Sequence, residues 1–187
     1  MSHSVRFSGL RRSFNSQRAF AWFLIVAGTA AMLDASSKLL AVKALAGSSF
    51  PFGERFALML VYNEGAVGGF SWGPYTWLIN VCLTSVAVTM ISFIVVHLAK
   101  IDRRASLSLG LVAGGAVGNL ASMLQGGNGV PDFLALRFSE SAVVCNVADL
   151  ALWSGAILLV PVVSTLLRAI RVERASKIMS TALLVSA

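Results

Sequence analysis

The residues best placed to do chemistry lie in a stretch that is otherwise apolar. Asn146 and Asp149 fall within residues 143–167, a segment long and apolar enough to span a bilayer. A carboxylate inside the hydrocarbon layer is costly unless it faces a polar cavity or a partner. We therefore interpret Asp149 as a functional residue, with a buried polar contact between helices as the structural alternative. Because the two residues are three positions apart, we expect them on one face of a helix.

Composition and charge place the chain in a membrane. Of the 187 residues, 57% are hydrophobic and only 12% are charged, which is typical of an integral membrane protein. The net charge of +7 comes from basic residues concentrated before the first apolar run, after the second and after the last. This is the positive-inside pattern of a protein with both termini in the cytoplasm. The distribution argues against nucleic-acid binding.

Four apolar runs predict four membrane helices. We expect the helices at about 19–40, 75–99, 106–124 and 141–167. The outside connection at 41–74 is rich in Gly, Pro and aromatic residues, which suits turns and short strands, with residues 56–62 as one strand. The predicted fold class is an all-α membrane protein, a four-helix bundle with a small periplasmic β-platform. The chain then divides into a cytoplasmic basic arm at 1–18, a membrane domain at 19–167 and a cytoplasmic tail at 168–187. The tail is expected to lie on the inner membrane surface or to be disordered.

Small residues and cysteines in the apolar runs are interpreted as packing residues. Gly110, Gly114 and Gly118 recur every four positions, which allows a second helix to approach closely, either within the bundle or from another chain. Cys82 and Cys145 are expected to pack as small apolar side chains. The sequence contains no Cys/His cluster at metal-ligand spacing, so we expect neither a metal nor a cofactor.

The polar residues of the apolar runs share one predicted depth, just below the outer surface. They are Asp34 and Lys38 in the first helix, Asn119 and Ser122 in the third, and Asn146 and Asp149 in the fourth. Asp149 is expected about eight residues, or roughly 12 Å, inside its helix. Asn63 in the outside connection is placed to cover these groups. We therefore predict a water-accessible polar site that faces outward. Asp34 and Lys38, at positions i and i+4, are expected to form an internal ion pair or to contact a lipid headgroup.

Five short blocks follow one another along the chain. They are Asp34-Ala35-Ser36-Ser37-Lys38, Tyr62-Asn63-Glu64-Gly65-Ala66, Gly114-Gly115-Ala116-Val117-Gly118-Asn119-Leu120, Val130-Pro131-Asp132-Phe133 and Cys145-Asn146-Val147-Ala148-Asp149. In this order they resemble the signature blocks of the lipoprotein signal peptidases (signal peptidase II). The resemblance covers about residues 20–167 and implies an aspartic peptidase of the bacterial cytoplasmic membrane. Such enzymes cut the signal peptide from diacylglyceryl-modified prolipoproteins with two carboxylates that share a proton.

The resemblance places Asp149 at the second catalytic aspartate, but the first is missing where the family pattern is expected to have it. Ser122 stands at that aspartate position and Met123 at the arginine that follows it. A hydroxyl cannot share a proton as a carboxyl does, and losing one member of a catalytic unit costs several orders of magnitude in rate. Asp132 is the possible substitute carboxylate, although it matches a block of its own. The residues expected to bind substrate are Asp34, Lys38, Asn63, Gly65, Asn119 and Asn146.

Three functions follow from these observations. The first is a divergent, catalytically impaired paralogue that keeps the pocket and binds a lipidated prolipoprotein or another membrane protein. The second is an active aspartic endopeptidase whose missing carboxylate is supplied by Asp132 or by a partner chain. The third is a structural subunit packed into a larger complex through the glycine stripe. A Ser–Lys dyad of Ser122 and Lys38 is a weaker alternative. All three functions place the chain in the bacterial inner membrane in contact with lipid.

Overall fold

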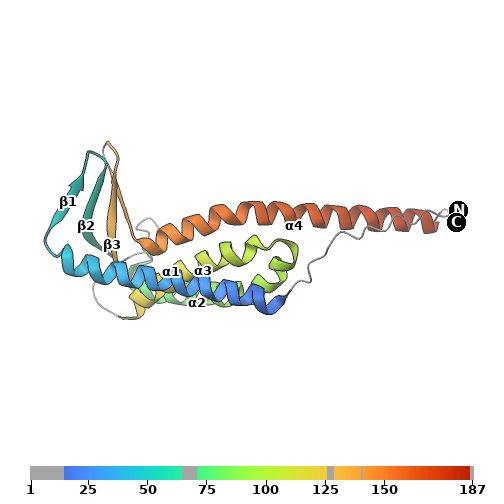
Figure 1. Ribbon diagram of the computed structural model, residues 1–187, viewed down its shortest axis with the longest axis horizontal. Coiled ribbons are helices and arrows are strands. Elements are labelled where there is room, and N and C mark those ends of the chain that lie inside the picture. The colour runs from blue at the N-terminus through green and yellow to red at the C-terminus, as the bar shows by residue number, and fades with distance from the viewer. Residues whose placement is uncertain (1–14, 65–70, 126–128, 140, 186–187) are drawn as a thin grey trace.

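The computed structural model describes residues 15–64, 71–125, 129–139 and 141–185 (Figure 1). Its elements run in the order α1 Ser16–Ala44, β1 Ser49–Phe52, β2 Phe56–Asn63, the 3-10 helix η2 Gly73–Tyr75, α2 Thr76–Ile101, α3 Arg104–Leu124, β3 Val130–Arg137, β4 Ala142–Cys145 and α4 Val147–Val185. The four long helices form a bundle, and the four strands form one sheet at one end of it. Residues 1–14 of the predicted basic arm lie outside the described residues.

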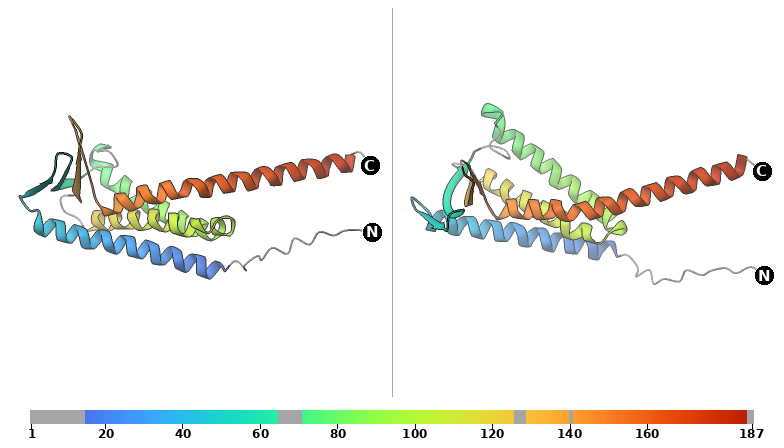
Figure 2. Two further views of the ribbon diagram at one scale, coloured as in Figure 1. Left: turned by 45° about the horizontal axis from the view of Figure 1, so that its top comes forward. Right: turned by 90° about the horizontal axis from the view of Figure 1, so that it is seen from above.

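Four helices of the described chain are long and apolar enough to cross a membrane, as predicted. In its most apolar window, 39% of the α3 residues are buried, compared with 17% in α1 and 6% in α2. This difference follows from the arrangement, because α3 packs against α1, α2 and α4 (Figure 2). The outer helices therefore present mostly apolar, unburied side chains, as expected of surfaces that face lipid.

The glycine stripe of α3 packs within the bundle. A Cβ atom added at Gly114 would lie 2.5 Å from the carbonyl oxygen of Ala27 in α1, and one at Gly118 would lie 2.5 Å from Oδ2 of Asp34. The nearest atoms to a Cβ at Gly110 also belong to α1. Since only glycine allows this approach, the stripe forms the contact between α1 and α3 and is not a surface for a second chain.

The sheet has the strand order β1-β2-β3-β4, with every neighbouring pair antiparallel. The predicted strand at 56–62 is confirmed as β2, whereas β3 and β4 were not predicted. The strands run across the direction of the helices (Figures 1 and 2). The register of β2 on β3 shifts between Leu58 and Val61, which leaves Asn63 opposite Val130 at the bundle end of the sheet. Such irregularities redirect side chains where strands meet a functional site.

The predicted start of the fourth helix at 141 is wrong. Val143 and Val144 belong to β4, where they pair with Leu136 and Ala135 of β3, and α4 begins only at Val147. Asp149 therefore lies in the first turn of α4 and not eight residues inside it. The reason is that an apolar run rich in β-branched residues serves a strand as well as a membrane helix.

The predicted end of the fourth helix at 167 is also wrong. The helix continues to Val185 and extends beyond the other helices (Figure 1). Residues 168–185 contain neither Gly nor Pro to end the helix. Glu173 and Lys177 form an i,i+4 ion pair of 2.7 Å on this exposed part. The other predicted helices agree with the structure to within about one turn.

Replacing Gly114 with Ala tests the α1–α3 contact. Because the new Cβ meets backbone of α1, we expect Gly114→Ala to lower the free energy of unfolding by about 1–3 kcal/mol. Reversible unfolding of the purified protein in detergent measures this change. Gly28→Ala is the matched control, since nothing lies within 4 Å of a Cβ there, and it should be neutral or slightly stabilising. Equal effects of the two substitutions would contradict the packing assignment.

Candidate functional site

Asp149 and Asn146 form a reciprocal cap at the N-terminus of α4. The Oδ1 atom of Asn146 accepts a hydrogen bond from the backbone N–H of Asp149 at 3.0 Å. Oδ2 of Asp149 accepts one from the backbone N–H of Asn146, also at 3.0 Å. This is a capping box, in which two otherwise unpaired helix N–H groups are satisfied. Asn146 is thus the residue that precedes α4. The prediction that it lies on one helical face with Asp149 is wrong.

Asp34 ties α1 to the same helix end. Its Oδ1 atom accepts a hydrogen bond of 2.9 Å from the backbone N–H of Ala148, and its Oδ2 atom lies 2.7 Å from Nζ of Lys38. The predicted Asp34–Lys38 ion pair is therefore confirmed. Both side chains are almost completely buried, at 0% and 6% exposed. A charge so deep in a membrane protein requires such a partner.

Lys38 holds the polar end of α3. Its ammonium group donates hydrogen bonds to Oδ1 of Asn119 at 2.8 Å and to Oγ of Ser122 at 3.2 Å. The Ser122 hydroxyl in turn donates to the carbonyl oxygen of Gly118 at 3.2 Å. The Ser122 hydroxyl therefore accepts a hydrogen bond from Lys38 and directs its own proton to Gly118, away from the Lys38 nitrogen. The geometry therefore gives no support to a Ser–Lys dyad.

Asp132 reaches the same place from the sheet. Its Oδ1 atom accepts a hydrogen bond of 2.6 Å from Nδ2 of Asn146, and its Oδ2 atom accepts one of 3.3 Å from Nδ2 of Asn63. Asn146 thus contacts both Asp132 and Asp149, and the two carboxyl groups lie on either side of it. Burial raises the pKa of Asp132 to about 6, and the negative charge of Asp149 contributes to this rise. The surroundings of Asp132 therefore favour its protonated form.

Asn119 connects these contacts. Its Nδ2 atom donates to Oδ1 of Asp149 at 3.1 Å, and its Oδ1 atom accepts from Nδ2 of Asn146 at 3.2 Å. One hydrogen-bonded network now contains eight of the residues singled out in the sequence. They are Asp34, Lys38, Asn63, Asn119, Ser122, Asp132, Asn146 and Asp149. Gly65, the remaining predicted residue, lies outside the described residues.

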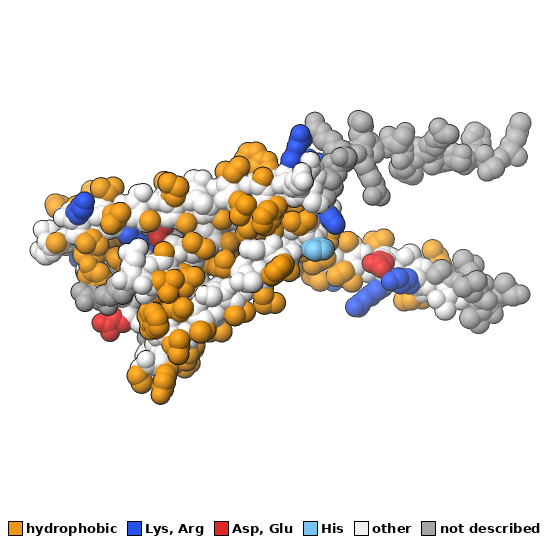
Figure 3. Space-filling model, turned by 90° about the horizontal axis from the view of Figure 1, so that it is seen from below, with side chains coloured by type: hydrophobic (Ala, Val, Ile, Leu, Met, Phe, Trp, Pro, Cys, Tyr) orange, Lys and Arg blue, Asp and Glu red, His pale blue; other side chains and the backbone are white. Residues whose placement is uncertain are grey.

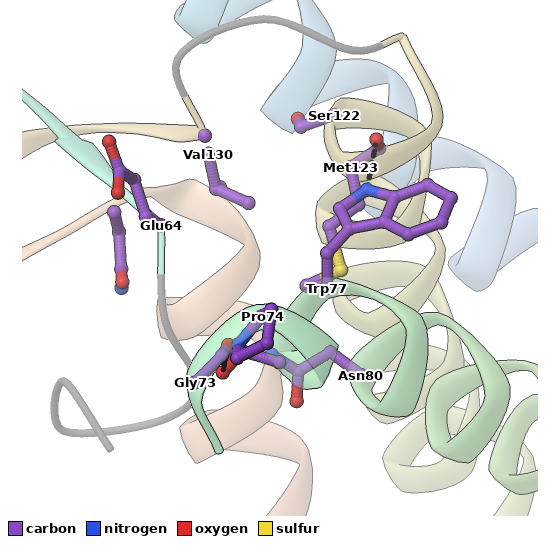
Figure 4. Close-up of a pocket in the computed structure, with 11 residues that line it drawn as sticks. Glu64, Gly73, Pro74, Trp77, Asn80, Ser122, Met123 and Val130 are labelled. Atoms are coloured by element: carbon purple, nitrogen blue, oxygen red, sulfur yellow. Dashed lines mark hydrogen bonds between the residues drawn. The ribbon is translucent and has the colours of Figure 1, made fainter. Parts of the chain in front are cut away.

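A cavity of about 260 Å³ adjoins the network (Figure 4). It lies where the start of α2 and the end of α3 meet the bundle ends of β2 and β3. Its lining includes Asn63, which binds Asp132, and Ser122, which binds Lys38. Trp77 and Met123 form another part of the wall, where the indole N–H donates to the Met123 carbonyl oxygen at 2.8 Å. Trp77 was not among the residues that the sequence predicted for the site.

Comparison with known proteins places this chain in a family. The family model described as signal peptidase (SPase) II matches residues 13–165. The chain belongs to the signal peptidase II family. It is 35% identical over 136 residues to a lipoprotein signal peptidase of Brevibacillus brevis, covering 72% of this chain and 89% of that one. It is 36% identical over 149 residues to one of Mycobacterium avium, covering 73% and 75%.

The signal peptidase II fold is also seen in two solved bacterial membrane enzymes. One, solved at 2.3 Å by the in meso method, superposes with a TM-score of 0.67 at 19% identity over 77% of this chain and 88% of the other. The second, solved at 1.9 Å, gives a TM-score of 0.66 at 19% identity over 76% and 92%. The predicted family and fold are confirmed. With its four apolar helices, the chain is a multi-pass protein of the bacterial inner membrane.

The raised pKa of Asp132 predicts a pH dependence of stability. Because the pKa is about 6 in the folded protein and about 3.8 as an ordinary value, the folded state binds more protons between these limits. The contribution of Asp132 to stability is therefore present below about pH 4 and lost as the pH rises through about 6. Unfolding free energies of the wild type and Asp132→Asn, measured from pH 4 to 7, should show this slope only in the wild type.

Glu54→Gln provides the control for this titration, since Glu54 is exposed in the turn between β1 and β2. It should keep the slope of the wild type. A protonated-carboxyl infrared band that disappears near pH 6 in the wild type and is missing in Asp132→Asn would assign the titration directly. A slope unchanged by Asp132→Asn would show that another group is responsible.

Proposed function

We propose that this protein is an active aspartic endopeptidase that removes the signal peptide of lipid-modified prolipoproteins, with Asp132 and Asp149 as its two carboxylates. The observation that carries the proposal is the position of Asn146, which donates to Asp132 through its side chain and to Asp149 through its backbone. The relatives are lipoprotein signal peptidases, and this supplies the proposed substrate class. Here Asp132, and not the residue at position 122, is the partner of Asp149.

The two carboxyl groups suit the two roles of aspartic catalysis. The pKa of about 6 allows Asp132 to carry the shared proton and to donate it to the scissile carbonyl oxygen. Asp149 takes a proton from a water molecule whose oxygen attacks the carbonyl carbon. The tetrahedral intermediate collapses when the C–N bond breaks, the leaving amine takes the proton from Asp149, and Asp132 recovers its own. The products are a signal peptide with a new carboxyl end and a lipoprotein with a free amino group.

The other predicted residues divide into positioning and substrate-contacting groups. Asp34 and Lys38 are buried and hydrogen-bonded within the protein, so we assign them to positioning the N-terminus of α4 and Asn119. Asn119 and Asn146 orient the carboxyl groups in the same way. Asn63 lines the cavity and contacts Asp132, which places it to orient the main chain of a substrate.

We also propose that the sheet lies on the outer side of the membrane and that both termini are cytoplasmic. Lys and Arg side chains lie at the end of the bundle away from the sheet and along the extension of α4, although some also lie at the sheet end (Figure 3). Arg18 lies in the first turn of α1, and Arg103 and Arg104 lie where α2 is followed by α3. Hydrophobic side chains cover the helices between the two ends. Positive charge at one end favours that end as the cytoplasmic one.

A catalytically impaired relative remains the second candidate. Ser122 and Met123 are uncharged where the resemblance leads us to expect an Asp-Arg pair, and Ser122 contacts Lys38 in the network. Such a protein would bind a lipidated prolipoprotein or another membrane protein without cutting it. A structural subunit is less favoured, because the glycine stripe on which it depended is occupied by α1.

Cleavage of a diacylglyceryl-modified prolipoprotein by the purified protein tests the proposal. We expect Asp132→Asn and Asp149→Asn each to lower kcat by at least about a thousandfold, because the two carboxyls act as a unit. Ser122→Ala should stay within about tenfold of the wild type, since a residue outside the dyad only supports it. Product release is measured by mass spectrometry. Glu54→Gln, a substitution in the exposed turn between β1 and β2, is the control outside the site and should leave kcat unchanged.

The outcomes separate the two candidates. A wild type that binds the prolipoprotein but does not cut it, and that becomes active as Ser122→Asp with Met123→Arg, would establish the impaired relative. Cleavage that survives Asp132→Asn in a folded protein would reject Asp132 as the partner of Asp149. Melting temperatures of every variant distinguish lost chemistry from lost structure.

A further inference from the structure

Several exposed basic residues lie at the end of the bundle away from the sheet. A small apolar core at that end contains Ala99 of α2, Ala105 of α3 and Val162 of α4, and Ala19 of α1 packs against it. Each of the basic residues lies within two turns of one of these apolar residues along the chain. They are Arg18, Lys100, Arg103, Arg104 and Arg168, here called the basic cluster. Because all four helices pack on one apolar core, the fold brings these positive charges to the same end (Figure 1).

A hydrogen bond fixes α4 against the connection between α2 and α3. The hydroxyl of Thr165 in α4 donates to Oδ2 of Asp102 in that connection at 3.4 Å. Arg168 lies three residues beyond Thr165, and residues three apart lie on the same side of a helix. Arg168 is therefore on the side of α4 that contacts this connection, which also carries Arg103 and Arg104.

The protein supplies little negative charge to balance the basic cluster. Among the described residues, no carboxylate forms an ion pair with any member of the cluster. Asp102 already accepts hydrogen bonds from the backbone N–H of Arg104 at 2.9 Å and from Thr165, and Glu173 is paired within the extension of α4. Residues 1–14 contain neither Asp nor Glu. Like charges near a membrane repel one another strongly, so binding of an external anion stabilises this end of the bundle.

We propose that the basic cluster binds the headgroup phosphate of an anionic phospholipid. The connection between α2 and α3 joins two membrane-spanning helices, so it lies where the hydrocarbon layer ends, at the depth of the headgroups. Basic residues of several helices at this depth form a site for a lipid phosphate, which guanidinium groups bind through paired hydrogen bonds. Ile101 and Leu167, beside the cluster, are 40% and 49% exposed and are placed to contact the acyl chains of the same lipid. This inference does not depend on whether the protein cleaves its substrate.

Native mass spectrometry of the full-length protein in detergent tests the site by measuring the dissociation constants of added lipids. We expect phosphatidylglycerol, which is anionic, to bind at least about tenfold more tightly than phosphatidylcholine, which has no net charge. The double variant Arg103→Gln with Arg168→Gln should weaken phosphatidylglycerol binding by at least about tenfold. Arg55→Gln with Arg137→Gln is the matched control, since it removes the same charge from exposed positions of the sheet. The control should bind phosphatidylglycerol as the wild type does.

Equal weakening by the two double variants, or equal binding of the two lipids, would overturn the proposal. An excess of inorganic phosphate should not displace phosphatidylglycerol, because free phosphate has no acyl chains. Complete displacement would identify free phosphate as the ligand and reject the lipid.

The melting temperature gives a second measurement. Phosphatidylglycerol should raise it in the wild type and in the control variant but not in Arg103→Gln with Arg168→Gln, because a ligand stabilises only the protein that binds it. A wild type that neither binds phosphatidylglycerol nor gains stability from it would reject the site and favour an acidic protein segment as its occupant.

Discussion

The structure depends on how the N-terminus of α4 is held. A helix that begins at the edge of a membrane leaves several backbone N–H groups without partners, and they must be satisfied in a poorly hydrated place. Here Asp34, which belongs to α1, accepts a hydrogen bond from one of these N–H groups, that of Ala148. The side chains of Asn146 and Asp149 accept hydrogen bonds from each other's backbone N–H groups. The polar residues are thus first a solution to a folding problem. The same hydrogen bonds place the carboxyl group of Asp149 beside Asn119 and Asn146, where it can take part in chemistry.

The chemistry of the site is distributed over two parts of the fold. Asp149, Asn119 and Lys38 come from the helical bundle, whereas Asp132 and Asn63 come from the sheet. Asn146 lies between β4 and α4 and joins the two parts, because it donates to Asp132 and also caps α4. Lys38 contacts the uncharged Ser122 and does not need a carboxylate at that position, since Asp34 already forms an ion pair with Lys38.

The sequence could predict those features that follow from long, simple patterns. The length of the apolar runs was enough to predict four membrane helices. The shared depth of their polar residues was enough to predict that Lys38, Asn119 and Asp149 would lie close together. It could not predict that residues 142–145 form a strand, because an apolar, β-branched segment fits either structure and only its pairing with β3 decides. For the same reason the sequence could offer Asp132 only as a possible substitute carboxylate. Its position beside Asn146 depends on the register of β3 with β2 and β4, which local sequence does not specify.

The division of the site between bundle and sheet makes it sensitive to mechanical separation of the two. Asp132 is carried by a thin four-stranded layer, and Asp149 by a long helix anchored across the bilayer. A tilt of that layer relative to the helix ends would move Asp132 away from Asp149 without unfolding either element. For the proposed peptidase, lateral pressure and bilayer thickness would then influence the reaction, since both act on the tilt of the sheet.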